Sequence, residues 1–249
     1  MEYLVRYACC SHRGLVRKMN QDNVLCDGMY MESPDTLFLS WHGAVSSKQP
    51  SLFAVFDGMG GEIKGEVAAL LAAKCASTVS IGADPESDLY QYCLNANALI
   101  CEYAEERGYY NMGTTAAMLA FTANRVTVCN VGDSKILRLK HNKLEQLSID
   151  DCWIAPPNMK APLLQNLGIP EEEMLIEPHI FGEAVCDRDL YLICTDGLTD
   201  LIDNKTIKRI MSETTFGEML DTLLLLALEK GGVDNISMII CRIETVSEQ

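Results

Sequence analysis

The stretch VFDGMGGEIKGEVAA, residues 55–69, decides the interpretation of this chain, because it joins an apolar run to an aspartate, glycines and an Ala-rich segment. Residues 51–57, SLFAVFD, are rich in the side chains typical of a buried strand. Residues 65–80, GEVAALLAAKCASTVS, are rich in Ala and Leu and predict a helix. Asp57 stands at this junction, and the question is whether it only ends the strand or also binds something.

The overall composition indicates a folded chain with a sizeable core. The chain has 249 residues, of which 48% are hydrophobic, and it contains no repeat and no low-complexity block. The formal net charge of -15 predicts repulsion from nucleic acids and from anionic lipid surfaces. We therefore expect neither a nucleic-acid partner nor a membrane partner, and an anion would need local help from a cation or an arginine.

The cysteine content favours a reducing compartment. Of the eleven cysteines only Cys9 and Cys10 are close neighbours, and the chain has no C-x-x-C pair, so the paired spacing of a zinc site is absent. An odd number of cysteines behind a start that does not resemble a secretory signal predicts reduced, mostly buried thiols and a cytoplasmic protein. The longest aliphatic run, LLLLAL at 223–228, is far too short to span a membrane.

The order of the predicted elements is typical of an α+β fold. Short strands before residue 58 are followed by predicted helices at 65–80 and 87–107. Residues 113–148 then contain three or four strands joined by short turns. Connections this short favour antiparallel pairing, so this segment predicts an antiparallel meander.

The second half of the chain begins with an irregular region, residues 148–188, which contains five prolines. Within it, PEEEMLIE at 170–177 has the proline and acidic residues typical of a helix start. A strand, two helices and a final strand follow. No linker divides the sequence, so we expect a single domain over residues 1–249.

Five aspartates lie at or next to the ends of predicted strands: Asp22, Asp57, Asp133, Asp196 and Asp234. If those strand ends meet at one edge of a sandwich, the carboxylates converge and repel one another. Divalent cations remove this repulsion, and donors that are all oxygen select hard ions such as magnesium or manganese. Two such ions can clamp a phosphoryl group. Ordinary turn chemistry is the better explanation of any one of these aspartates alone, whereas the five together leave both interpretations open.

Six sequence blocks occur in one order along nearly the whole chain: GLVRKMNQDN, FAVFDGMGGEIKGEVAA, GTTAAMLAF, VCNVGDSKILRL, LICTDGLTDLI and GGVDNISMII. Together they resemble the metal-dependent protein phosphatases of type 2C, the PPM family, in its bacterial branch. Several blocks in the right order are far more specific than any single motif. The resemblance implies a central antiparallel β-sandwich flanked by pairs of α-helices, a four-layer αββα fold with metals at one end.

The resemblance also implies a set of metal ligands. Asp57 would bridge two metal ions, manganese or magnesium, and the backbone carbonyl of Gly58 would be a further ligand. Asp196 and Asp234 would complete the protein ligands of that pair.

Three further roles follow from the same resemblance. Asp22 would hold metal-bound waters, and Asp133 together with Asp196 would bind the third, weaker metal of bacterial members. Arg17 would bind the substrate phosphate. This last role also has a physical reason, because a guanidinium can contact two phosphate oxygens at once and lysine cannot.

The activity that the resemblance implies is hydrolysis of phosphoserine and phosphothreonine in proteins by direct attack of a water that bridges two metal ions. Its substrates would be phosphoproteins produced by a Ser/Thr kinase, as part of signalling. The alternative is a catalytically weak or dead copy that acts as a binding or regulatory module. Such a copy would usually have lost Asp57, Asp196 or Asp234, and all three are present. We therefore expect an active enzyme.

The chain departs from the family pattern after LEQLS. The family usually has a longer flap and a segment that ends in Arg-Ala-Leu-Gly, whereas residues 149–169, IDDCWIAPPNMKAPLLQNLGI, lack that arginine. We expect a short flap near 148–188, in which Trp153 either packs against the protein or contacts substrate. Glu62 stands where many bacterial members have histidine.

Overall fold

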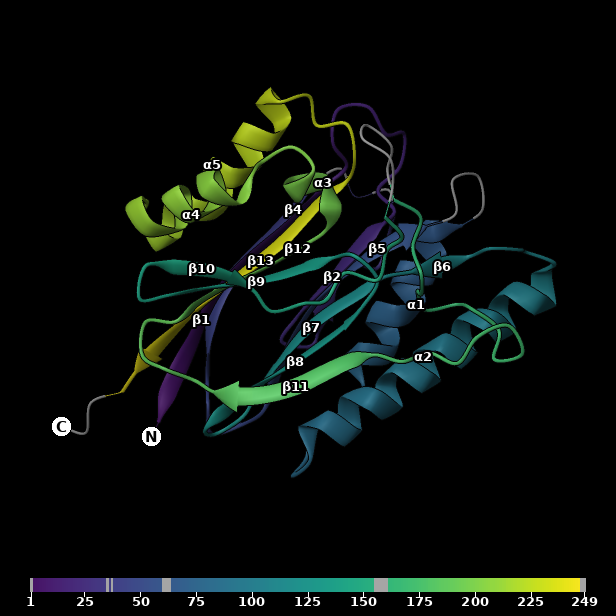
Figure 1. Ribbon diagram of the computed structural model, residues 1–249, viewed down its shortest axis with the longest axis horizontal. Helices are drawn as coiled ribbons and strands as arrows, with labels where there is room; N and C mark the ends of the chain where they lie inside the picture. The colour runs from purple at the N-terminus through teal and green to yellow at the C-terminus, as the bar shows by residue number, and fades with distance from the viewer. Residues whose placement is uncertain (1, 35, 37, 60–63, 155–160, 247–249) are drawn as a thin grey trace.

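The centre of the molecule is a pair of antiparallel sheets (Figure 1). The computed structural model describes residues 2–34, 36, 38–59, 64–154 and 161–246. The first sheet has the strand order β10 (Lys143–Gln146), β9 (Lys135–Lys140), β12 (Leu190–Cys194), β13 (Ile236–Thr245), β1 (Tyr3–His12) and β4 (Phe38–Ser46). The second sheet has the order β11 (His179–Ala184), β8 (Arg125–Val131), β7 (Ala116–Phe121), β5 (Ser51–Met59), β2 (Asp22–Cys26) and β3 (Met29–Tyr30). The two-residue strand β6 (Gly113–Thr114) also pairs with β5.

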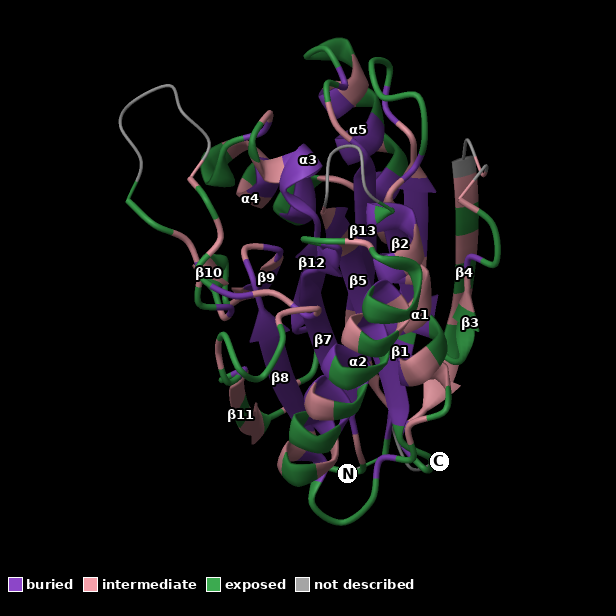
Figure 2. Ribbon diagram, turned by 90° about the vertical axis from the view of Figure 1, so that its right-hand side faces the viewer, coloured by how far each residue is buried: buried purple, intermediate pink, exposed green. Residues whose placement is uncertain are grey.

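Helices cover the outer faces of both sheets. The helices α1 (Gly65–Ser77) and α2 (Pro85–Arg107) pack on the second sheet, and α4 (Asn204–Glu213) and α5 (Phe216–Glu229) pack on the first. The single turn α3 (Asp196–Thr199) connects β12 to this second pair. Figure 2, in which α1 and α2 face the viewer, shows strands buried behind helices whose outer faces are exposed.

Three buried clusters separate the four layers. Strand β5 contributes to two of them, because Phe53 and Val55 pack between the sheets whereas Ala54 and Phe56 pack under α1 and α2. This alternation is the period of two expected for a strand that is covered on both faces. The third cluster lies between the first sheet and α4 and α5. The predicted four-layer αββα fold is therefore confirmed.

The predicted meander over residues 113–148 is wrong in one respect. Strands β7 and β8 pair in the second sheet, and β9 and β10 pair in the first, so β8 and β9 lie in different sheets. The chain crosses between the sheets at Gly132, whose φ of +94° lies in the region that favours glycine. A short turn can therefore change sheets as well as reverse direction within one.

The predicted helix start at 170–177 is also wrong. Pro170 accepts hydrogen bonds from the N–H groups of Glu173 at 2.9 Å and Met174 at 3.1 Å, and the chain then continues without a helix to β11. Ile176 is buried in the cluster beneath α1 and α2, so packing of an extended segment outweighs the local helix signal.

Two sequence-based expectations concern thiols and membranes. All eleven cysteines are free, and seven of them are buried, as expected. Among the residues that the structure describes, no helix is long and apolar enough to cross a membrane.

Candidate active site

The site is centred on the pairing of β5 with β2, where Asp57 lies directly opposite Asp22. Asp57 does not end its strand, because β5 continues to Met59 by exchanging β7 for β6 as its partner. The backbone of Asp57 is held on both sides: its N–H donates to Thr115 Oγ1 at 3.0 Å, and its carbonyl accepts from Thr115 N at 2.9 Å. The carboxylate is therefore carried by a rigid, fully paired segment rather than by a loose turn.

Gly58 allows three segments to meet beside Asp57. A Cβ at this position would lie 2.2 Å from the carbonyl oxygen of Gly65 and 2.3 Å from that of Gln21, distances that no side chain tolerates. The Gly58 N–H also donates to the Gln21 carbonyl at 3.2 Å. The start of α1 and the residue before β2 are thus fixed against the end of β5. Glu62 lies outside the described residues.

Asp133 lies on the turn by which the chain changes sheets. On one side of it the Gly132 N–H donates to Asp151 Oδ2 at 2.9 Å, and on the other Ser134 Oγ lies 2.7 Å from Thr115 Oγ1. Thr115 therefore connects the turn of Asp133 to the backbone of Asp57.

Asp196 and Asp234 approach from the first sheet, at the start of α3 and just before β13. A Cβ at Gly197 would lie 1.9 Å from the Asn235 carbonyl oxygen, so only glycine lets the two segments touch. Asp234 Oδ1 accepts a hydrogen bond from the Asn235 N–H at 2.8 Å. Its Oδ2 accepts one from Arg17 Nη2 at 2.7 Å. The arginine predicted to bind phosphate thus bonds to a predicted metal ligand here.

The loop that carries Arg17 is fastened by a residue that the sequence analysis did not single out. The buried side chain of Asn235 accepts from Gln21 N at 2.8 Å and donates from Nδ2 to the carbonyl oxygens of Arg13 and Met19, at 2.8 and 3.0 Å. These three bonds hold both ends of the loop. The only sequence signal for this role is that Asn235 directly follows Asp234.

Asp22 is buried behind the other aspartates. Its Oδ2 accepts from Thr195 Oγ1 at 2.9 Å. Burial, together with the charges of Asp234 and Asp196, raises the pKa of Asp22 to about 7, against the lowering effect of its hydrogen bonds to Ser237 and Thr195. A carboxyl in this position favours a positive charge nearby.

These residues meet at one cavity of about 430 Å³. Its walls include Arg17, Asp57, Gly58, Asp133, Asp196 and Asp234, together with Ala161, Pro162 and Leu163 of the flap. All of the residues predicted to bind metal or phosphate, except Asp22, therefore line a single space. Within the described part of the chain, however, no three His, Cys, Asp or Glu side chains form a group that could hold a metal ion.

The chemistry of this cavity nevertheless fits a hard cation. Four carboxylates and one guanidinium line it, so negative groups outnumber positive ones. Every negatively charged atom that could ligate a metal ion there is a carboxylate oxygen. Magnesium and manganese prefer such donors and retain several waters, so they do not need a complete protein shell. The arrangement can thus accept divalent ions between the aspartates.

The flap is fastened through Asp151, a second residue that the sequence analysis did not assign to the site. Its Oδ2 accepts from Gly132 N and from Gln165 Nε2, each at 2.9 Å, and its Oδ1 lies 2.7 Å from His179 Nε2. One carboxylate therefore connects the turn of Asp133 to the flap and to β11. Trp153 is 62% exposed, which disfavours the packing alternative.

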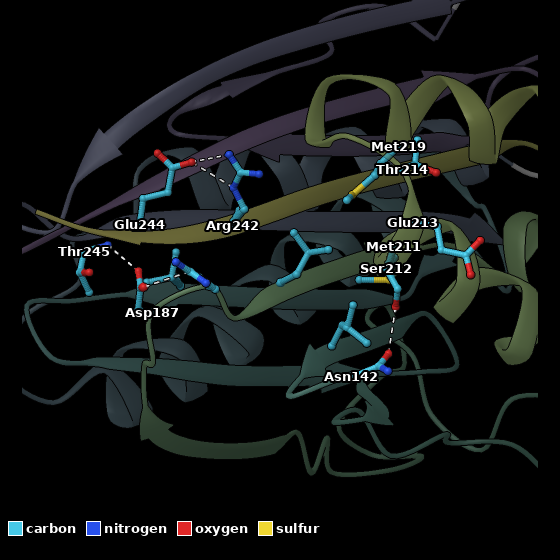
Figure 3. Close-up of a pocket in the computed structure, with 14 residues that line it drawn as sticks. Asn142, Asp187, Met211, Ser212, Glu213, Thr214, Met219, Arg242, Glu244 and Thr245 are labelled. Carbon is cyan, nitrogen blue, oxygen red and sulfur yellow. Dashed lines mark hydrogen bonds and ion pairs between the residues drawn. The ribbon is translucent and has the colours of Figure 1, made fainter.

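A larger cavity, of about 960 Å³, lies away from these aspartates (Figure 3). It is bordered by the β9–β10 turn, the end of α4 and the end of β13, and none of the predicted site residues lines it. Its charged groups bond within the protein: Arg242 Nε donates to Glu244 Oε1 at 3.0 Å, and Asp187 Oδ1 accepts from Thr245 N at 2.9 Å. Size alone would have selected the wrong cavity.

The sequence of this chain is similar to those of known phosphatases. Residues 40–153 match the family model described as Protein phosphatase 2C. The chain is 30% identical over 251 residues to the serine/threonine phosphatase stp of Listeria innocua, covering 92% of each protein. It is 28% identical over 254 residues to the serine/threonine protein phosphatase PstP of Mycobacterium tuberculosis. That alignment covers 95% of this chain and 45% of PstP, so the chain spans about half the length of this relative.

Solved structures agree with the sequence matches. The crystal structure of the Mycobacterium tuberculosis phosphatase PstP/Ppp superimposes with a TM-score of 0.80 at 28% identity, covering 97% of this chain and 100% of that one. A second structure, the catalytic domain of PstP in complex with two manganese ions, superimposes with a TM-score of 0.79 at 28% identity. It covers 98% of this chain and 100% of the other.

Proposed function

This chain belongs to the protein phosphatase 2C family of serine/threonine protein phosphatases, and from that premise we propose that it is a metal-dependent enzyme that removes phosphate from phosphoserine and phosphothreonine in proteins. The observation that carries the proposal is the shared cavity. Four aspartates and one arginine, drawn from five separate segments, line one space although they are up to 217 positions apart. A fold that needed these residues only for turns would have no reason to bring them together.

The proposed ligands of two divalent ions are Asp57, the carbonyl of Gly58, Asp196 and Asp234. Asp133, with Asp196, would hold a third ion. When bound, such ions neutralise phosphoryl oxygens and lower the pKa of a coordinated water. Magnesium and manganese both suit this donor set, and the two manganese ions in the PstP catalytic domain support the choice of a divalent cation.

Arg17 is the proposed phosphate-binding group. Its Nη2 donates to Asp234, and a guanidinium carries five N–H donors, so the same group can also reach phosphoryl oxygens in the cavity. Asn235 fixes the loop on both sides of Arg17 and thereby orients the guanidinium before substrate arrives. Asp22, buried behind the other aspartates, would hold metal-bound waters.

The wider context of the activity is also a proposal. The whole chain, 1–249, would act as one catalytic domain with a short flap near 148–188. Its substrates would be phosphoproteins made by a Ser/Thr kinase, in the cytoplasm, where the free cysteines stay reduced.

Hydrolysis assays test this function directly. Turnover of p-nitrophenyl phosphate and of a phosphothreonine peptide should require manganese or magnesium and stop with EDTA. Asp57→Asn and Asp196→Asn should both lose this turnover, whereas Asp187→Asn, which removes a carboxylate from the larger cavity, should retain it. A folded wild-type protein that shows no turnover with either metal would contradict the proposal and favour a binding or regulatory module.

A further inference from the structure

Residues 13–19, RGLVRKM, form a basic and apolar loop in a strongly acidic chain, and we call this segment the Arg17 loop. It contains Arg13, Arg17 and Lys18 and no acidic residue, although Asp and Glu outnumber Lys and Arg by 35 to 20 over the whole sequence. Leu15 and Val16 are 63% and 65% exposed. A local reversal of charge combined with exposed aliphatic side chains is typical of an interaction surface.

The exposure of these side chains is imposed by a fixed backbone. Leu15 N donates to the Gly232 carbonyl at 2.7 Å, and Asn235 holds the carbonyls on both sides of the exposed residues. Gly14, at a φ of +79°, passes so close to Asp234 that a Cβ would lie 2.1 Å from its carbonyl oxygen. The loop therefore cannot fold its apolar side chains inward without breaking these contacts.

The patch extends onto the neighbouring loop. A Cβ at Gly232 would lie 3.1 Å from Leu15 Cγ, so Leu15 packs beside that glycine. The next residue, Val233, is itself 51% exposed. The aliphatic surface thus lies directly beside Asp234 and Arg17 of the candidate site.

Part of the cavity wall is apolar. Pro162 and Leu163 of the flap line the cavity together with Arg17. The backbone N–H of Trp153 donates to the Pro162 carbonyl at 2.9 Å. This bond places the exposed Trp153 next to that wall. The cavity that would receive a phosphoryl group therefore has apolar side chains in its wall, and the exposed Leu15 and Val16 belong to the loop whose Arg17 lines the same cavity.

We propose that the Arg17 loop binds the residues next to the phosphorylated residue, and that it selects phosphoprotein segments with a large apolar side chain close to it. This inference rests on the proposed function, because the cavity must take the phosphoryl group. Leu15 and Val16 lie two and one residues from Arg17 respectively, and an extended peptide advances about 3.4 Å per residue. An apolar side chain within about two positions of the phosphoresidue can therefore reach the loop.

The positive charge of the Arg17 loop also favours a phosphorylated protein segment as its ligand. The Arg17 guanidinium lines the cavity and complements a doubly negative phosphoryl group, and Arg13 and Lys18 add positive charge to the same loop, whereas the aspartates of the cavity repel that group unless cations are bound between them. Water is displaced from aliphatic surface on both partners when an apolar side chain lies on Leu15 and Val16, which favours binding.

The test compares two phosphothreonine peptides that differ only in whether leucine or serine occupies the positions two residues before and after the phosphothreonine. Wild-type kcat/KM should be about tenfold higher for the leucine peptide, mainly through KM. The double variant Leu15→Ser/Val16→Ser should reduce this ratio to about twofold. Leu225→Ser is the matched control, because Leu225 is 59% exposed on α5 and lines neither cavity, and it should leave the ratio unchanged.

A binding measurement keeps the inference separate from catalysis. Fluorescence anisotropy of both labelled peptides, each with a non-hydrolysable phosphonate in place of the phosphate, should give the same order of affinity for the wild-type protein in manganese, and Leu15→Ser/Val16→Ser should remove the difference. Equal turnover of both peptides by the wild type would overturn the inference and leave the phosphatase function standing. Absence of any turnover would overturn the function, and equal dissociation constants for the two peptides would then overturn the inference as well.

Discussion

The two cavities of this protein both contain charged residues, but the smaller one concentrates one sign and the larger one balances both. Four aspartates and one arginine line the 430 Å³ cavity, whereas the 960 Å³ cavity has Arg188 and Arg242 together with Asp187, Glu213 and Glu244. Figure 3 shows the contacts that its lining residues make with one another. Excess charge of one sign, rather than volume, marks the space that needs a ligand.

The pKa shifts at the two cavities run in opposite directions. Hydrogen bonds from Arg6 and Arg242 lower the pKa of Glu244, and the Thr245 N–H lowers the pKa of Asp187, so these carboxylates are already stabilised by the protein. Burial and neighbouring aspartates instead raise the pKa of Asp22 behind the smaller cavity. Negative charge is therefore favoured at Glu244 and Asp187 and disfavoured at Asp22.

The largest loss of activity is expected for removal of one aspartate from the smaller cavity, compared with removal of one aspartate from the larger cavity. Asp57→Asn should lower kcat on p-nitrophenyl phosphate by on the order of a thousandfold, because it removes the carboxylate proposed to bridge the metal ions. Steady-state assays at saturating manganese measure this loss. Asp187→Asn, which removes one carboxylate of the larger cavity, should change kcat less than about twofold. Similar losses in both variants would erase the distinction between the cavities.

Arg17→Lys should have the next largest effect. Lysine keeps the positive charge but loses the two-pronged geometry, so kcat/KM should fall about tenfold to a hundredfold. Kinetics on the phosphothreonine peptide provide the measurement, with Arg188→Lys in the larger cavity as the control. An unchanged kcat/KM for Arg17→Lys would show that charge alone suffices at this position.

Asn235→Ala tests whether Arg17 depends on the fastening of its loop. Loss of three partly buried hydrogen bonds should lower kcat/KM about tenfold and destabilise the fold by about 1–3 kcal/mol. The kinetic effect should largely disappear in an Arg17→Ala background, because the two residues act as one unit. Faster hydrogen exchange confined to residues 13–21 would support this order of action, whereas fully multiplicative kinetic effects would contradict it.

The smallest effect concerns the larger cavity. Glu244→Gln should leave activity unchanged and lower stability by at most about 1 kcal/mol at pH 7, since surface ion pairs contribute little. The folded-state pKa of Glu244 is lowered, so its contribution is present above the unfolded pKa near 4.5 and is lost as pH falls further. Urea denaturation at pH 7 and pH 4 should therefore show the variant and the wild type converging at the lower pH. A difference that grew on acidification would contradict the ion pair.

Two predictions from the sequence were wrong, and each has a physical reason. PEEEMLIE has the local signals of a helix start, yet burial of Ile176 keeps the segment extended after one turn. The turn at Gly132 resembles any hairpin turn, yet it moves the chain between sheets and so brings Asp133 to the cavity. Local composition cannot report such outcomes, because they depend on surfaces contributed by distant segments.

The sequence by itself predicted apolar strands, helices and polar strand ends from patterns within about ten residues, and its six ordered blocks, through the family that they resemble, implied the four layers and the aspartates of the site. Only the tertiary structure decided that Arg17 bonds to Asp234, that Asn235 holds the Arg17 loop and that Asp151 holds the flap. The bonds that fasten the Arg17 loop join residues more than 200 positions apart. Hydrogen bonds of that kind depend on the final position of each atom, which the fold fixes and the spacing of residues does not.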